Sequence, residues 1–186
     1  MIVDEIRDYV AGECKSGRNA FGPAFFDEHL SVVARYAVEL GGTLGADLEI
    51  VELAAWMHDL SAVQDFAVLP KHAALSAEIA RKMLQERGYP AERIERVAAC
   101  IASHSTPIQI GSGLLEEVCV SNADAISQIV KPSYWHYYIF KVRGFGFTEG
   151  RDWLRQRVAS HWVALIPEAR SLIETQYAQV EVCLKL

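Results

Sequence analysis

The stretch from Glu49 to Leu60 constrains the fold most, because it is an apolar helical segment that ends on a histidine followed directly by an aspartate. Val51, Ala54 and His58 recur at the spacing of one helix face. The face that buries this helix therefore also directs the imidazole inward, next to the carboxylate of Asp59. A divalent metal ion would satisfy both buried groups, since imidazole nitrogen and carboxylate oxygen are good metal ligands.

The His58-Asp59 doublet alone does not establish a metal site. A core histidine bonded to a backbone carbonyl, with Asp59 as a helix-end residue, is the simpler explanation of two such residues. A metal site requires further ligands from elsewhere in the chain.

Further histidines lie at inward positions of other predicted helices. Pro23 suits the start of a helix whose apolar face includes His29, and we expect this helix to end at Gly41-Gly42. His72 lies in the first turn of a helix that opens at Pro70 and ends at Gly88-Tyr89-Pro90. His104 follows the apolar face of a helix over residues 91–103, so that it sits at a helix end, as His58 does.

An aspartate occupies the interior of the next predicted helix, which covers residues 114–126. Aspartate has poor helix propensity, so Asp124 needs a reason to be there. Gln128 and Lys131 follow at i+4 and i+7, and a solvated polar face explains both adequately. His136 and His161 lie outside this ordered set, and we interpret them as structural.

The other local signals concern helix boundaries and the C-terminal third. Asp47 can cap the helix that ends at His58, and the segment from Ser61 to Pro70 is expected to be irregular. The aromatic run over residues 133–140 is expected to form core or pocket wall. Pro167 can start the last helix. Together these patterns predict an all-α chain without internal repeats.

Composition narrows the class of protein. With 51% hydrophobic residues in short periodic runs and no apolar block of membrane length, the chain is expected to be globular and without a bilayer span. The formal net charge of -6 argues against binding an extended nucleic acid, which needs a basic face. A small phosphorylated ligand needs only a few local cations.

Cysteine usage and the N-terminus predict a cytoplasmic protein. The four cysteines lie far apart without a C-x-x-C pair, which suits reduced thiols. The first residues are acidic where a secretory signal would be basic.

The ordered set resembles the HD superfamily of metal-dependent phosphohydrolases, which is named for its His-Asp doublet and has a helical bundle fold. The ordered set in this chain consists of His29, His58, Asp59, His72, His104 and Asp124. The resemblance implies a single HD-type domain over residues 1–186, with a metal-binding core at about 25–130 and C-terminal helices over 131–186 packed on it.

His72 and His104 resemble the additional ligands of the dinuclear branch of that family, in which the doublet aspartate bridges two metals. Carried over by position, one metal would be held by His29, His58, Asp59 and Asp124, and the other by Asp59, His72 and His104. A thiolate-free set of this kind favours Fe or Mn, with Zn, Mg, Ni or Co as alternatives.

The resemblance implies hydrolysis of a small phosphorylated substrate, such as a nucleotide, by two metals about 3.5–4 Å apart. Asp59 would act at the catalytic centre as the bridging ligand. Lys131, two turns beyond Asp124, is our candidate for a cation facing the substrate, ahead of Lys71, Arg18 and Arg143. Nothing in the sequence sets the substrate or the oligomeric state.

One departure from the family keeps other functions open. Several hydrolytic branches have a lysine three residues after the doublet aspartate, where this chain has Ala62. A smaller branch of the same fold uses a His/Asp-ligated di-iron pair to activate oxygen, so an HD-type oxygenase is the first alternative. A metal-stabilised nucleotide-binding module without turnover is the second.

Overall fold

The computed structural model describes residues 1–184 and is all-α, as the sequence predicts, with no strand in that range. Two π-helical segments and a 3-10 segment connect the α-helices. The elements are α1 (Ile2–Cys14), η1 (Phe26–Leu30), α2 (Ser31–Leu44), α3 (Leu48–Met57), α4 (Leu60–Gln64), η2 (Phe66–Lys71), α5 (His72–Glu86), α6 (Ala91–Ser103), α7 (Leu115–Val130), α8 (Pro132–Tyr137), η3 (Tyr138–Val142), α9 (Phe147–Ala164) and α10 (Pro167–Leu184).

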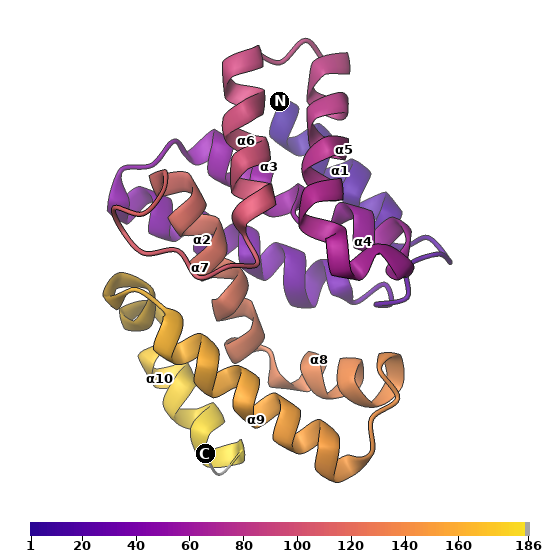
Figure 1. Ribbon diagram of the computed structural model, residues 1–186, viewed down its shortest axis with the longest axis vertical. Helices are drawn as coiled ribbons and strands as arrows, with labels where there is room; N and C mark the ends of the chain where they lie inside the picture. Colours follow the sequence, from indigo (N-terminus) through magenta and orange to yellow (C-terminus); the bar gives the residue numbers. More distant parts are fainter. Residues whose placement is uncertain (185–186) are drawn as a thin grey trace.

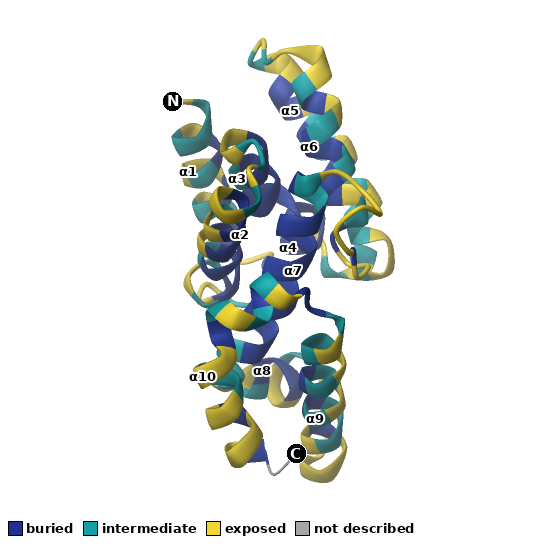
Figure 2. Cartoon of the chain, turned by 90° about the vertical axis from the view of Figure 1, so that its left-hand side faces the viewer, coloured by how far each residue is buried: buried dark blue, intermediate teal, exposed yellow. Residues whose placement is uncertain are grey.

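Helix α7 is the central element of the molecule. It packs on α2, α3 and α6 on one side and on α9 and α10 on the other, so it joins the N-terminal helices to the C-terminal ones (Figure 1). Most of α7 is buried, and α3 is buried at every position except Leu48, Glu49 and Glu52 (Figure 2). The last five residues of α3, 53–57, are all buried, so the doublet that follows them starts from the molecular interior.

Several helix boundaries follow the local signals in the sequence. The side chain of Asp47 accepts a hydrogen bond from the backbone N–H of Ile50 and caps α3, as predicted. Gly88 follows the end of α5 with φ 68°, a conformation that favours glycine. Pro167 begins α10.

The expected stop at Gly41-Gly42 was wrong, because α2 continues to Leu44 and ends at Gly45 with φ 77°. Gly41 is instead a packing position against α3. A Cβ added to Gly41 would lie 2.8 Å from Cδ2 of Leu48, so the absence of a side chain lets the two helices approach.

The segment from Ser61 to Pro70 was predicted to be irregular, and the structure shows short helical turns there, α4 and η2. Tertiary hydrogen bonds stabilise them. The Ser61 hydroxyl donates to the carbonyl of His72 at 3.0 Å, and the Ser61 N–H donates to the Ser76 hydroxyl at 3.1 Å. These contacts tie the residues after the doublet to α5, which presents His72.

Within the described residues, no helix combines the length and the apolar character needed to cross a bilayer.

Candidate metal centre

Four histidines and two aspartates converge from separate elements. They are His29 in η1, His58 after α3, Asp59 before α4, His72 at the start of α5, His104 after α6 and Asp124 inside α7. Three of the histidines stand at a helix boundary, where the end of a buried helix projects the ring into a common space. The structure therefore brings together the whole set proposed from the sequence.

Asp59 lies between two pairs of histidines, and each of its carboxylate oxygens faces one pair. Its Oδ2 lies 3.4 Å from Nε2 of His29 and 3.4 Å from Nε2 of His58. Its Oδ1 lies 3.2 Å from Nε2 of His72 and 3.7 Å from Nε2 of His104. The two groups His29-His58-Asp59 and Asp59-His72-His104 could each hold a metal ion, with Asp59 shared between them.

Asp124 belongs to the first of these groups. Its Oδ1 lies 3.5 Å from Nε2 of His29 and 3.9 Å from Nε2 of His58. The first group thus has two imidazoles and two carboxylates, and the second has two imidazoles and the shared carboxylate.

Hydrogen bonds on the far side of each ring determine which nitrogen faces the centre. Nδ1 of three histidines lies against a backbone carbonyl three residues earlier, and a carbonyl can only accept. These pairs are His58 with Ala55 at 2.8 Å, His72 with Leu69 at 2.7 Å and His104 with Ile101 at 2.6 Å. Each Nδ1 therefore carries a proton, and Nε2 is the nitrogen that faces the centre and could bind a metal ion.

His29 reaches the same tautomer through a hydroxyl. The Ser127 hydroxyl donates to the carbonyl of Asp124 at 2.7 Å, so its oxygen is free to accept from Nδ1–H of His29 at 2.9 Å. His29 lies in a π-helical turn, a local geometry that often occurs at functional sites.

The residues present fit divalent metal ions. Nε2 of His29 lies 3.0 Å from Nε2 of His58, and Nε2 of His72 lies 3.1 Å from Nε2 of His104. Two imidazole nitrogens at that distance repel each other unless a proton or a metal ion lies between them. Imidazole and carboxylate donors without thiolate suit such a cation.

The electrostatics of the centre also favour positive charge. Burial opposes a charge on His58, but the carboxylates of Asp59 and Asp124 outweigh it and raise its pKa to about 9. Burial acts to raise the pKa of Asp59, yet His58 and His29 hold it well below its ordinary value. Burial and the neighbouring His58 lower the pKa of His104 to about 4. A metal ion would supply the positive charge that, without a metal, a proton on His58 provides to the two carboxylates.

The centre opens into a cavity of about 280 Å³. Five of the six proposed ligands, all except His58, line it. The remaining lining residues are aromatic, aliphatic, polar or cationic: Phe21, Phe25, Leu69, Ser105, Gln128, Trp135, Tyr138, Arg143, Trp153, Arg157 and His161. The C-terminal elements therefore supply both arginines and much of the aromatic wall.

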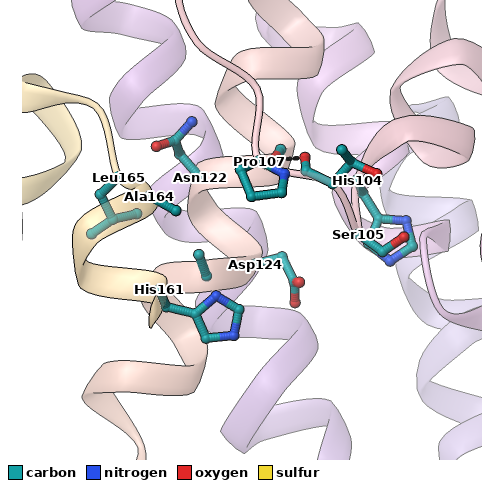
Figure 3. Close-up of a pocket in the computed structure, with 11 residues that line it drawn as sticks. His104, Ser105, Pro107, Asn122, Asp124, His161, Ala164 and Leu165 are labelled. Carbon is teal, nitrogen blue, oxygen red and sulfur yellow. Dashed lines mark hydrogen bonds between the residues drawn. The ribbon is translucent and has the colours of Figure 1, made fainter. Parts of the chain in front are cut away.

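A second pocket of about 30 Å³, enough for a single water molecule, lies beside this cavity. Figure 3 shows His104, Asp124 and His161 around it, with the side chains of Asp124 and His161 projecting into the same space from α7 and α9. Helix α9 therefore lies beside the proposed centre.

Gln128, Arg157 and His161 line the cavity and were missed by the sequence interpretation. Gln128 was assigned to a solvated polar face, and that was wrong, because it is 4% exposed and hydrogen-bonds to Asp124. His161 was interpreted as structural, and it lines the cavity. The available signal was the i, i+4 pair of Arg157 and His161, which puts two polar residues on one face of α9.

Lys131 does not continue the helix face of Asp124. Helix α7 ends at Val130, and Lys131 has φ -121° and ψ 53° because the following Pro132 disfavours helical geometry before it. The Lys131 ammonium group pairs with Glu28 at 3.0 Å and is not among the described residues that line the cavity. Its role toward a substrate stays a prediction. Ala62 is fully buried and also absent from that lining.

The sequence of residues 26–129 matches the family model of the HD domain. The chain belongs to the HD domain family. The matched range includes every residue of the proposed metal centre and leaves out the C-terminal helices that complete the cavity.

Solved structures share the fold over nearly the full chain. Bacillus subtilis YpgQ superimposes with a TM-score of 0.73 at 22% identity, covering 98% of this chain and 91% of that one. The structure of YpgQ in complex with ADP has a TM-score of 0.70 at 26% identity, covering 95% and 90%. A predicted HD superfamily hydrolase from an uncultured Thermotogales bacterium has a TM-score of 0.59 at 22% identity, covering 84% of each chain.

A curated relative shares part of the sequence. Ribonuclease Y of Cutibacterium acnes is 35% identical over 111 residues, which are 59% of this chain. The chain spans only 18% of the length of that relative.

Proposed function

We propose that this HD-domain protein is a metal-dependent phosphohydrolase that acts on a small phosphorylated substrate, with nucleotides as the first class to test. The observation that supports it most is the position of Asp59, whose two carboxylate oxygens face two different pairs of histidine Nε2 atoms. That arrangement suits two cations side by side and open to a cavity.

The residues would divide between the two ions as their distances suggest. His29, His58, Asp59 and Asp124 would hold one ion, and Asp59, His72 and His104 the other. When bound, such ions supply Lewis acidity toward a phosphoryl oxygen and toward the attacking water.

The protein's own groups contribute orientation and charge. The backbone carbonyls behind three histidines, and Ser127 behind His29, hold a proton on each Nδ1, so Nε2 is the nitrogen that a metal ion would bind. Arg143 and Arg157 bring positive charge to the cavity, where a phosphate ester needs it. These arginines would supply the positive charge that several hydrolytic branches of the family provide with a lysine at the position of Ala62.

Size and charge support a small substrate over an RNA chain. The cavity of about 280 Å³ lies just below the usual range of small-molecule pockets, roughly 300–1,000 Å³. The formal net charge of -6 disfavours a long polyanion. The ADP complex of YpgQ supports a nucleotide as the ligand to try first.

The test is an anaerobic assay of a panel of nucleotides and phosphomonoesters with Mn, Mg, Zn or Fe as the added metal. We expect release of phosphate or of a shorter nucleotide without oxygen, with redox-inert metals active as well. Asp59→Asn should abolish turnover, and Asp152→Asn is the matched control, since Asp152 is a half-buried residue that pairs with Arg151 and does not line the cavity.

Two outcomes would contradict the proposal. Product that forms only with iron and oxygen would indicate an HD-type oxygenase. Tight nucleotide binding without product under every condition would indicate a binding module.

A further inference from the structure

Gln128 connects the proposed metal centre to helix α9. It lies one turn after Asp124 and is 4% exposed. Its Nε2 donates to Oδ2 of Asp124 at 3.1 Å. Its Oε1 accepts from Nε2 of His161 at 3.2 Å and from Nε of Arg157. A single buried amide therefore contacts a metal-facing carboxylate on one side and a cavity arginine on the other.

The orientation of this amide follows from its partners. The Asp124 carboxylate can only accept hydrogen bonds, so the NH₂ group must face it. The Arg157 guanidinium can only donate, so the amide oxygen must face α9. No other orientation satisfies both neighbours, and no other neutral side chain of this length offers both a donor and an acceptor.

The amide also selects which oxygen of Asp124 is free. Oδ2 is occupied by Gln128, whereas Oδ1 lies 3.5 Å from Nε2 of His29 on the side of the metal centre. Gln128 therefore presents Asp124 to the centre through one oxygen, which is the function of a positioning residue behind a metal ligand.

Arg157 is held in place while its two terminal amino groups remain for a ligand. Its Nε is bound to Gln128, and its guanidinium lies over the ring of Trp153 at 5.1 Å. Among the described residues, no carboxylate forms an ion pair with it, although it lines the cavity. By contrast, Arg151 on the same helix pairs with Asp152 at 2.8 Å.

We propose that Arg157 is the anion-binding residue of this cavity, that its two terminal amino groups take two oxygens of a phosphoryl group, and that Gln128 positions both Arg157 and Asp124. This inference rests on the proposed function, because it places the phosphoryl group beside the metal centre. A planar guanidinium fork matches two phosphoryl oxygens, which a lysine ammonium cannot do.

The test measures binding of inorganic phosphate, which is not consumed, to the manganese-loaded protein by calorimetry. Arg157→Ala should weaken phosphate binding on the order of 10- to 100-fold, as expected for loss of charged hydrogen bonds. Arg157→Lys should restore part of the affinity. Arg151→Ala removes the same side chain from the same helix and should bind phosphate as the wild type does.

Metal affinity separates the two roles. Arg157→Ala should leave metal content unchanged, whereas Gln128→Leu should weaken both phosphate binding and metal binding, the latter on the order of 10- to 100-fold. Thermal unfolding of each variant checks that it folds. Wild-type metal affinity in folded Gln128→Leu would contradict its positioning role.

The binding assay is independent of turnover. Equal phosphate affinity in Arg157→Ala and Arg151→Ala would overturn the assignment of Arg157, whether or not the wild type hydrolyses any substrate. Selective loss of phosphate binding in Arg157→Ala would support the assignment even if no substrate of the panel were hydrolysed, a result that would count against the hydrolase function alone.

Discussion

Replacing Ser127 with alanine should weaken the binding of one metal ion and leave the other unchanged. Ser127 is not a proposed metal ligand, but its hydroxyl oxygen accepts the hydrogen bond from Nδ1–H of His29 at 2.9 Å. Without that acceptor, a fully buried ring nitrogen has lost its partner, since His29 is 1% exposed. The ring then gains by moving its proton to Nε2, the nitrogen that must be unprotonated to bind a metal.

The size of the effect follows from the cost of an unpaired buried donor, about 1–3 kcal/mol. The metal-free variant avoids this cost by moving the proton from Nδ1 to Nε2. Metal binding must move the proton back, so the full free-energy cost appears as a loss of metal-binding free energy. Metal affinity at the group of His29, His58 and Asp124 should therefore fall roughly 5- to 140-fold, at 1.4 kcal/mol for each tenfold change. The group of His72 and His104 does not contact Ser127 and should keep its affinity.

The assay is a chelator competition titration with elemental analysis of the bound metal. Ser121→Ala is the matched control, because Ser121 is another buried serine on α7 and donates to the carbonyl of Thr106 at 2.6 Å. Both variants should lose a similar free energy of unfolding, about 1 kcal/mol. If Ser127→Ala binds both equivalents with wild-type affinity, the tautomer argument is wrong.

Three further predictions concern other parts of the chain. His72→Ala should remove one of two metal equivalents, as measured by elemental analysis. His136→Ala is the control and should remove none, because the His136 ring bonds to a local backbone carbonyl. If the wild type binds a single equivalent and His72→Ala does not change it, the site is mononuclear. Lys131→Ala should raise KM or lower kcat for phosphorylated compounds without changing metal content, and unchanged kinetics would exclude it as a substrate contact. Burial raises the pKa of the Cys14 thiol to about 12, so this thiol stays protonated at pH 8. A thiol-reactive dye should therefore label the exposed Cys183 first, and rapid labelling of Cys14 in the folded protein would refute this.

The all-α fold and the side chains of the proposed metal centre could be predicted from the sequence because they depend on local pattern. An apolar helix that ends in a histidine predicts a ring at the edge of a core, and this applies to His58 and His104. Asp124 was found because its residue type conflicts with its helical position. These signals need only the few residues around each side chain.

The rest of the cavity depends on packing between distant elements, which local pattern does not show. Gln128 looks like a surface residue until α9 covers it, and Arg157 and His161 acquire their partner only through that contact. Lys131 was placed by extending a helix period past the point where Pro132 ends it. Gly41 was interpreted as a stop because the approach of Leu48 is a tertiary contact.

The most direct test of a centre bridged by Asp59 is the metal content of Asp59→Ala beside that of the wild type, purified and loaded in the same way. Asp59 contributes an oxygen to each group of histidines, whereas each histidine contributes to one. We predict two equivalents of divalent metal per chain in the wild type and loss of most of both in Asp59→Ala. Full metal content in the folded variant would contradict the assignment of this centre.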